Sequence, residues 1–559
     1  MSGLTEAQKR EIGQHFVCGF HGHEVSENIK TLIKDYYLGN VILMKRNVQS
    51  SAQVHRIVHE LQSLAKEAGH TRPLMIGIDQ ENGLVSAFST AATGEAGTQF
   101  PGAMALAATG STELASAVST ATAKELRAVG INWVYSPVGD INTDPRNPVI
   151  GVRSFGDDPA TVARYVQAVS TALTSERVAP SAKHFPGHGN THVDSHLSLP
   201  RILVNKDQLK TTELAPFSAV VQDGIASIMT GHMALPLVTG DDTPCSLSRA
   251  ITTDLLRGEL GYEGVVVTDC LEMEAVAEKY GSEGGAVRSL EAGADVVMIC
   301  HTFKRHVGAI EATYAAVQDG RLSIDELHES GARIAQMKDR FAGTWEEVLA
   351  PFDAGRVADM QKEHYLLSAR AYIAAISHIP NSRPFIRLST SGPAVLFTPR
   401  MESINLAVDD AGGQLRDGAG RIRNTAGPSF LAFAASVSRR VVAVEHVVYA
   451  PGDDLSDALK ENLRAATSVI FATRNGFEKG AWQIDTLRRV IDIVRSGEGG
   501  LQKMVAVSTC APYDLLAVGD LQVPALATYE FTIPALEAVT AAIYGEVEVT
   551  GKVPVRMTA

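Results

Sequence analysis

Residues 183–200, KHFPGHGNTHVDSHLSLP, contain the densest group of side chains that could carry chemistry. Histidines recur there at four-residue intervals, which on one face of a helix would suggest a metal site. Pro186, Gly187 and Gly189 interrupt the helical backbone that this alignment needs. We therefore expect a long loop whose polar groups serve catalysis, with no metal or other cofactor. Metal analysis of the purified protein separates the two interpretations.

Within that segment, Asp194 stands two residues before His196. At this spacing the carboxylate can orient the imidazole and hold its proton, so the pair can act as a general acid and then as a base. The plainer alternative is a histidine that only hydrogen-bonds within its loop.

A second candidate is Asp269, which ends the apolar run of VVVTDCLEME, residues 265–274. A carboxylate at the exit of a barrel strand projects toward a substrate and can attack an anomeric carbon. Retaining glycosidases combine such an ionised group with a proton donor about 5 to 6 Å away. Asp194 and His196 would supply that donor, so the two features complement each other.

The elements that would position these groups alternate between short β-branched runs and longer helical patterns, which is typical of βα units around a parallel sheet. Seven strands are visible before residue 300, and an eighth would close a barrel. The predicted strands are 41–45, 74–79, 131–138, 178–185, 227–233, 264–269 and 294–299.

Helical patterns fill the gaps between these strands. One helix is expected to start after an N-cap at Ser111 and to stop at Gly130. Another presents a single apolar stripe with helical spacing. The stripe consists of Val162, Tyr165, Val166, Val169 and Leu173.

Polar residues interrupt the strands mainly at their carboxyl ends, and in a β/α barrel that rim carries the active site. Taken singly, each could be a strand cap or an ion-pair partner, but their shared position favours a function. The residues are Asp79, Lys183, His184, His232 and Asp269.

The alternation of predicted strands and helices stops after the first part of the chain, and a second alternation of strands and helices follows. We expect a catalytic barrel over 1–345, a linker over 346–388 with a helical stretch near 358–377, and a smaller α/β domain over 389–559. In the last of these, five strands and three helices are predicted. The strands are AVLFTP, HVVYAP, SVIFATRN, KMVAVSTC and PALATYEF, and the helices lie near 455–466, 480–497 and 533–544.

Composition narrows the possible partners and location. A net charge of −13 without a long basic cluster argues against nucleic acid. A charged N-terminus and the lack of a long apolar stretch argue against secretion and a membrane span, so a cytoplasmic protein is expected. The cysteines suggest neither a disulfide framework nor a zinc site. They are Cys18, Cys245, Cys270, Cys300 and Cys510.

Together these motifs resemble glycoside hydrolase family 3, in particular its N-acetylglucosaminidase branch. The resemblance is carried by KHFPGHG with D-S-H, IGIDQENG, NPVIGVRSFG and VVVTDCLEME, and in the C-terminal half by TCAPYDL, ATYEF and TGKVPVRM. It implies an α/β architecture, a (β/α)8 TIM-like barrel followed by a C-terminal αβα sandwich domain. It also implies a retaining exo-β-N-acetylglucosaminidase that acts on a carbohydrate substrate. A monomer or homodimer is expected.

The resemblance also assigns roles to matching positions. Asp269 would be the nucleophile, and Asp194 with His196 would be the acid/base dyad that replaces a glutamate of other branches. Four further residues would bind the hydroxyls of the terminal sugar, for which charged and bidentate groups are suited. They are Asp79, Arg153, Lys183 and His184.

Some alternatives stay open. Arg153 could instead be a structural partner of Asp157 or Asp158, and Asn132, Asp140 and His232 are weaker site candidates. The chain could also be a phosphorylase, because a neutral imidazole lets phosphate approach, or an inactive sugar-binding homologue.

One motif departs from the family. Residues 79–85 read DQENGLV where the family usually has DQEGGRV, so an expected arginine is missing. Chito-oligosaccharides or GlcNAc-conjugates are therefore expected as substrates in preference to anhydromuramoyl compounds.

Overall fold

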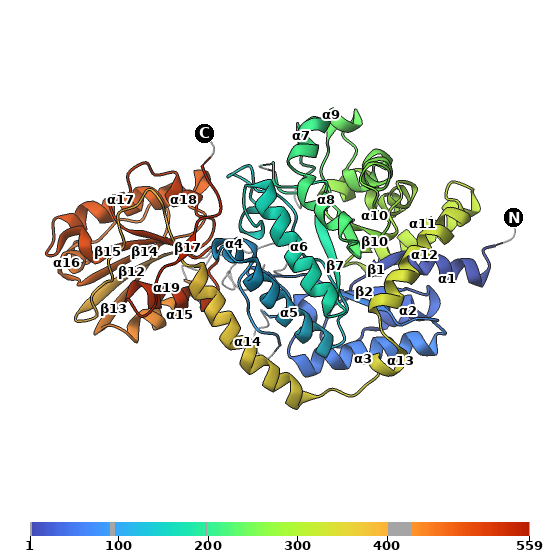
Figure 1. The fold of residues 1–559 in the computed structure, drawn as a ribbon, viewed down its shortest axis with the longest axis horizontal. Helices are drawn as coiled ribbons and strands as arrows, with labels where there is room; N and C mark the ends of the chain where they lie inside the picture. Colours follow the sequence, from blue (N-terminus) through green and yellow to red (C-terminus); the bar gives the residue numbers. More distant parts are fainter. Residues whose placement is uncertain (1–2, 90–95, 192, 196–197, 401–425, 558–559) are drawn as a thin grey trace.

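The computed structural model describes residues 3–89, 96–191, 193–195, 198–400 and 426–557. Two parts are visible in Figure 1, a barrel formed by the first half of the chain and a smaller sheet domain formed by its C-terminal third. This confirms the predicted fold class.

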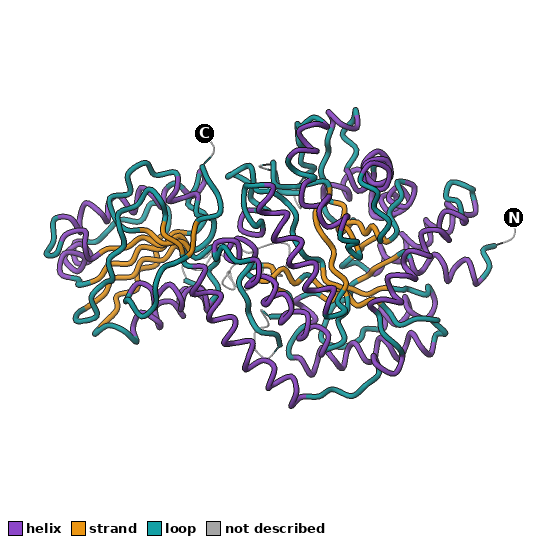
Figure 2. Tube along the Cα trace, viewed as in Figure 1, coloured by secondary structure: helices purple, strands orange, loops and turns teal. Residues whose placement is uncertain are grey.

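Parallel strands close the barrel in the order β1-β10-β9-β8-β7-β6-β3-β2. Seven of them match the predicted strands, and the eighth is β1, which pairs with β10 on one side and β2 on the other. Figure 2 shows these strands ringed by helices. The strands are β1 Phe16–Cys18, β2 Asn40–Leu43, β3 Met75–Ile78, β6 Trp133–Val134, β7 Ala179–Phe185, β8 Ser227–Thr230, β9 Val265–Cys270 and β10 Val296–Ile299.

The helices around the barrel follow the expected local signals. In α5, Thr112–Ala128, the hydroxyl of Ser111 accepts the amide of Leu114, and Gly130 takes a left-handed φ of 86° just past the helix. In α6, Pro159–Ser175, all five residues of the predicted stripe are buried. The other helices are α1 Glu6–Gln14, α2 Glu27–Asp35, α3 Ser51–Glu67, α4 Ala103–Ala108, α7 Lys206–Thr211, α8 Ala215–Gln222, α9 Pro236–Thr239, a π-helix Ala250–Glu259, α10 Glu274–Glu291, α11 Phe303–Gln318, α12 Ile324–Phe341 and α13 Trp345–Val348.

A long helix, α14 (Ala354–Ala375), leads from the barrel to the C-terminal domain and contacts both. The C-terminal sheet has the order β13-β12-β14-β15-β16-β11-β17. Its strands are β11 Ser377–His378, β12 Pro393–Pro399, β13 Ala443–Tyr449, β14 Ser468–Thr473, β15 Met504–Ser508, β16 Ala525–Ala527 and β17 Gly551–Lys552.

Side chains that alternate along β12 pack into two separate cores. Val395 and Phe397 face one helical layer, formed by α16 and α17, whereas Leu396 faces the other, formed by α15 and α19. The domain is therefore an αβα sandwich. Its helices are α15 Gly427–Ser438, α16 Asp457–Ala465, α17 Trp482–Arg495, α18 Tyr513–Leu516 and α19 Ile533–Ile543.

Among the described residues, no helix combines the length and the apolar character needed to cross a membrane.

Candidate active site

The carboxyl ends of the barrel strands surround a cavity that is partly open to solvent. All the lining residues come from the barrel part of the chain. Five of the residues predicted for the site line it together, from three strand ends and one loop. They are Asp79, Arg153, Lys183, His184 and Asp269.

Asp269 lies at the end of β9 and is partly exposed, with its carboxylate on the cavity. Its Oδ1 accepts the backbone amide of Cys270 at 2.7 Å, which fixes the carboxylate against its own strand. A buried carboxylate pointing into the barrel core could not reach a substrate. Asp269 therefore faces the cavity, where a substrate can reach it.

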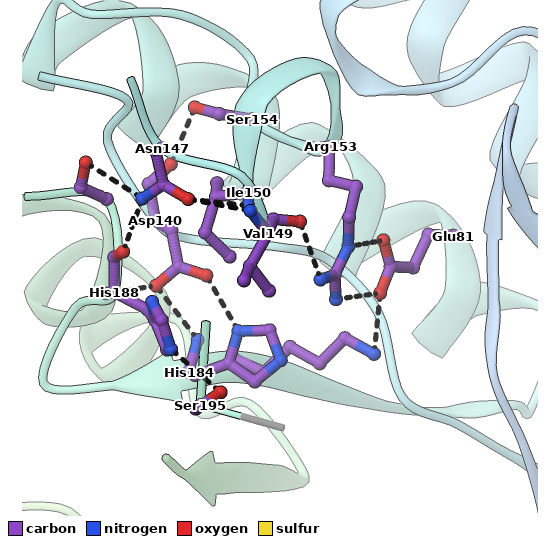
Figure 3. A network of polar contacts seen from close by, with 12 residues as sticks. Glu81, Asp140, Asn147, Val149, Ile150, Arg153, Ser154, His184, His188 and Ser195 are labelled. Atoms are coloured by element: carbon purple, nitrogen blue, oxygen red, sulfur yellow. Dashed lines mark hydrogen bonds and ion pairs between the residues drawn. The ribbon is translucent and has the colours of Figure 1, made fainter. Parts of the chain in front are cut away.

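Buried ion pairs form another part of the cavity wall (Figure 3). The Arg153 guanidinium makes two parallel hydrogen bonds to Glu81, at 2.9 and 2.8 Å. The Lys183 ammonium lies 2.7 Å from a carboxylate oxygen of both Asp79 and Glu81. The cluster presents the partly exposed Asp79 carboxylate to the cavity on a rigid base.

These charges set one another's protonation. Burial alone would raise the pKa of Glu81, but the charges and hydrogen bonds of Arg153 and Lys183 outweigh it and lower the pKa to about 2. Burial alone would lower the pKa of Lys183, but Asp79 and Glu81 raise it overall. Both groups are therefore charged at neutral pH.

The sequence places Arg153 next to Asp157 and Asp158, but neither is its partner. Asp158 caps the amide of Thr161 at the start of α6, and Asp157 accepts the amide of Arg556 from the C-terminal end of the chain. Arg153 is therefore the buried ion-pair partner of Glu81 and of neither Asp157 nor Asp158.

A turn before Arg153 aims its side chain at the cavity. The side-chain oxygen of Asn147 accepts the amides of Val149 and Ile150, at 3.0 and 2.9 Å. The carbonyl of Val149 accepts a hydrogen bond from the guanidinium of Arg153 at 3.1 Å, in addition to the two that this guanidinium donates to Glu81. Figure 3 shows this chain of contacts leading to Glu81.

His184 is held by Asp140, a fully buried residue of the loop after β6. The ring Nδ1 of His184 donates to Asp140 at 2.7 Å, and the backbone amides of His184 and His188 donate to the other carboxylate oxygen. Burial would raise the pKa of Asp140, but the interactions with His184 and His188 lower it. Asp140, a weaker candidate from sequence, therefore orients His184.

His188 connects the cavity wall to the segment that holds the proposed dyad. Its Nε2 hydrogen-bonds with the hydroxyl of Ser195 at 3.0 Å, and both residues line the cavity. Burial lowers the pKa of His188 to about 4, so its ring is neutral. The structure therefore brings Ser195, the residue between Asp194 and His196, to the same cavity as Asp269.

The predicted dyad is only partly described. Asp194 belongs to the described residues, whereas His192 and His196 lie outside them, so the distance from Asp269 to the imidazole stays a prediction. Of the other two histidines in the segment, His184 faces Asp140 and His188 faces Ser195.

The two remaining weaker candidates serve the barrel. Asn132 accepts the amide of Ile76 and so joins β3 to the start of β6. His232 hydrogen-bonds with Ser246 and donates to the carbonyl of Cys270, which fixes the strand end that carries Asp269.

A strand-end carboxylate facing an ionic cavity on the carboxyl rim of a β/α barrel is the layout of a barrel enzyme. Residues 8–337, more than half of the chain, match the family described as Glycosyl hydrolase family 3 N terminal domain. The chain belongs to glycosyl hydrolase family 3.

Relatives and solved structures agree with this assignment. Beta-hexosaminidase A of Pseudoalteromonas piscicida is 33% identical over 373 residues, which are 63% of this chain and 61% of that protein. A family 3 beta-N-acetylglucosaminidase from Paenibacillus sp. str. FPU-7 is 31% identical with a TM-score of 0.84, covering 100% of this chain and 99% of that one. A fungal multi-domain GH3 beta-N-acetylglucosaminidase is 35% identical with a TM-score of 0.86, covering 98% of this chain and 60% of that one. The chain thus spans less than two thirds of two of these three proteins.

Proposed function

We propose that the chain is a retaining exo-β-N-acetylglucosaminidase that releases terminal β-linked GlcNAc from chito-oligosaccharides or GlcNAc-conjugates. The observation that carries this proposal is the cavity shared by Asp269, the ion-paired cluster of Asp79 and Lys183, and Ser195. The names of the relatives support the sugar and the linkage.

In the proposed reaction, Asp269 attacks the anomeric carbon and forms a covalent glycosyl-aspartate. His196, oriented by Asp194, protonates the leaving oxygen and then activates the water that releases the sugar. Asp79, Arg153, Lys183 and His184 hold the hydroxyls of the terminal sugar. Because Lys183 ties Asp79 to Glu81, the hydroxyl-binding groups are preorganised before the substrate arrives.

The apolar part of the lining supports an acetamido sugar. Val149, Met229, Met273 and Met298 line the same cavity as the charged residues. A methyl group on the substrate gains from such contacts, whereas a hydroxyl in that place would lose hydrogen bonds to water. We therefore assign this surface to the N-acetyl methyl.

Hydrolysis is favoured over phosphorolysis by the charge of the lining. The lysine and the arginine among the described lining residues are each held by a carboxylate, Glu81 or Asp79. An incoming phosphate would have to displace one of these buried pairs, which is costly.

The test is a panel of aryl β-glycosides of GlcNAc, glucose and xylose, each assayed with and without phosphate. The proposal expects fastest turnover of the GlcNAc glycoside, with free GlcNAc as the product in both buffers. Formation of GlcNAc-1-phosphate as the main product would make the protein a phosphorylase. Binding of GlcNAc without turnover would make it an inactive homologue.

We further propose that the protein works in the cytoplasm, as a monomer or homodimer. All five cysteines are unpaired and buried, which supports a reducing compartment.

A further inference from the structure

Two cysteines and a histidine line the cavity beside the proposed nucleophile. Cys270 ends β9 and Cys300 directly follows β10, and these two strands are neighbours in the barrel. The two sulfur atoms and a ring nitrogen of His301 all lie within 4.8 Å of one another. Although the cysteines are 8% and 3% exposed, both contribute to the cavity surface.

The surroundings of Cys270 favour its thiolate. The hydrogen bond with Cys300 lowers the pKa of Cys270 most strongly, and a hydrogen bond with His301 lowers it further. Burial raises this pKa, but the hydrogen bonds outweigh it, so the pKa of Cys270 falls to about 6. The thiol of Cys300 is the opposite case, because its hydrogen bond to Cys270 and its burial raise its pKa. One sulfur is thus an activated nucleophile and the other a protonated neighbour.

Arg46 fixes the ring of His301 in the state that supports this thiolate. Its guanidinium lies 3.0 Å from the ring Nδ1 and also donates to the carbonyls of Cys300 and Phe20. Since a guanidinium only donates, Nδ1 accepts and Nε2 carries the ring proton. That proton is the one available to the sulfur of Cys270.

The same contact argues against a metal ion in this cluster. A cation on Nε2 would have to replace the ring proton while Nδ1 still accepts from Arg46, which leaves an imidazolate. The nearby guanidinium charge also repels a cation. The cluster suits thiol chemistry better than coordination.

We propose that Cys270 and Cys300 form a peroxide-reactive thiol pair in the wall of the substrate cavity. The thiolate of Cys270 attacks one oxygen of a hydroperoxide, so that an S–O bond forms, the O–O bond breaks, and the other oxygen leaves as water or an alcohol after protonation. The thiol of Cys300 then loses its proton and attacks the Cys270 sulfur. An S–S bond forms, and the sulfenic oxygen leaves as water.

Oxidation at Cys270 acts on the neighbouring nucleophile, and this consequence rests on the proposed function. The peptide of Cys270 is clamped, because its amide donates to Asp269 at 2.7 Å and its carbonyl accepts from His232 at 2.9 Å. Because the amide of Cys270 is bonded to the Asp269 carboxylate, a disulfide that pulls Cys270 toward β10 moves the carboxylate as well. Displacements of about 1 Å can cost about 100-fold in rate.

The other cysteines provide an internal comparison. Burial raises the pKa of Cys18, Cys245 and Cys510 above the ordinary thiol value, to about 11 for Cys510. They stay protonated at neutral pH and react slowly with peroxide.

The test maps the thiols of the full chain by mass spectrometry before and after stoichiometric hydrogen peroxide. We expect a Cys270–Cys300 cross-linked peptide, reversed by dithiothreitol, while Cys18, Cys245 and Cys510 remain reduced. In Cys300→Ser, a dimedone adduct should accumulate on Cys270, and the matched control Cys510→Ser should give the wild-type pattern. If a variant does not fold, the thiol map of the wild-type protein still tests the proposal.

Activity is measured on the same samples. We expect it to fall by at least about 10-fold on oxidation and to recover with dithiothreitol. Cys270 left reduced, or an oxidised enzyme that is fully active, would overturn the proposal. So would one equivalent of Zn²⁺ that protects both thiols, since the cluster would then be a metal site. If the unoxidised protein cleaves no GlcNAc glycoside, the proposed function fails, but the thiol map still decides the chemistry.

Discussion

Glu81 determines whether the cavity wall holds its charges in place. It lies between two buried cations, with the Arg153 pair at 2.8 Å and the Lys183 pair at 2.7 Å. Its side chain is only 4% exposed, so water compensates little for a lost partner. Removing one partner of such a cluster leaves an uncompensated buried charge, which costs more than the intact pair contributes.

Glu81→Gln should therefore lower the free energy of unfolding by about 3 kcal/mol and reduce kcat/KM for a GlcNAc glycoside by about 100-fold. Glu347→Gln, which breaks the exposed pair with Arg177, is the matched control and should cost less than about 1 kcal/mol. Urea denaturation and steady-state kinetics measure both effects. Equal losses in the two variants would contradict the role of Glu81.

The pH dependence of stability in wild type and in Glu81→Gln gives a second test of this role. The pKa of Glu81 is about 2 in the folded protein, below the ordinary value of 4.5. The stabilisation is therefore present in full above about pH 4.5 and is lost as the pH falls toward 2. Wild type should lose more stability than Glu81→Gln over this range, and parallel curves would show that Glu81 is not the group concerned.

At the scale of the element, the loops after β6 and β7 lock together at the cavity rim. A β-carbon on Gly189 would lie 1.7 Å from the carbonyl oxygen of Ile141, so only glycine lets the two backbones approach. The side-chain amide of Asn147 bridges them by donating to the carbonyls of His188 and Gly189. This contact fixes the start of the segment that leads to Ser195.

Gly189→Ala should accordingly separate the two loops and reduce kcat/KM by at least about 10-fold, with a loss of about 2 kcal/mol in stability. Gly284→Ala, inside α10 with nothing within 4 Å of the added carbon, serves as the control. It should leave activity unchanged and stabilise the protein by up to about 1 kcal/mol. Melting curves and kinetics compare the two, and an unaffected Gly189→Ala enzyme would show that the loops need no such contact.

The elements also show what one sequence can and cannot predict. Seven barrel strands were predictable because they lie in longer, mostly apolar segments. In contrast, β1 is a run of three residues between His15 and Gly19 and is recognised only by its pairing with β10 and β2. The Ala- and Ser-rich helix α15 went unpredicted because the exposed Leu431 and the alanines obscure the stripe formed by its buried residues Phe430, Phe433 and Val437.

Site residues divide in the same way. Asp79, Lys183, His184 and Asp269 were predictable, because parallel strands bring their carboxyl ends to one rim. The partnership of Glu81 with Arg153, 72 positions apart, depends on how the β4 segment (Gln80–Asn82) turns back over the barrel. The position of Glu81 two residues after Asp79 was the only signal. Cys270 and Cys300 stand at the ends of the strands predicted at 264–269 and 294–299, so the same rule brings both to the rim, and only the pairing of β9 with β10 shows that they meet.

On the scale of the whole molecule, a buried carboxylate joins the two domains. Glu530, in the loop after β16, accepts the amide of Gly102 from the barrel at 3.0 Å and the hydroxyl of Thr532 at 2.8 Å. Burial raises its pKa to about 7, against the hydrogen bonds that favour the ionised form. The helix α4 that follows Gly102 packs against the core of the C-terminal sheet, so this contact lies at the interface of the two domains.

Because the pKa of Glu530 is raised from 4.5 to about 7, the folded protein binds its proton more tightly than the unfolded chain. Its ionisation therefore costs stability as the pH rises from 4.5 to 7, and the cost is constant above that. Glu530→Gln, which stays neutral, should be more stable than wild type at pH 8 by about 2 kcal/mol, with a smaller difference at pH 5. Melting temperatures at the two pH values test this, with the exposed Glu548→Gln as control. A difference that does not change with pH would contradict it.

The central claim is that Asp269 attacks the sugar, and covalent trapping tests it most directly. The protein is incubated with a 5-fluoro derivative of β-GlcNAc that carries a good leaving group, then digested, and its peptides are weighed. We expect the peptide that contains Asp269 to gain one fluorinated GlcNAc, and Asp269→Asn to show neither the label nor turnover. Turnover of the GlcNAc glycoside without a label on Asp269, as in a route through the substrate's own N-acetyl group, would contradict the account.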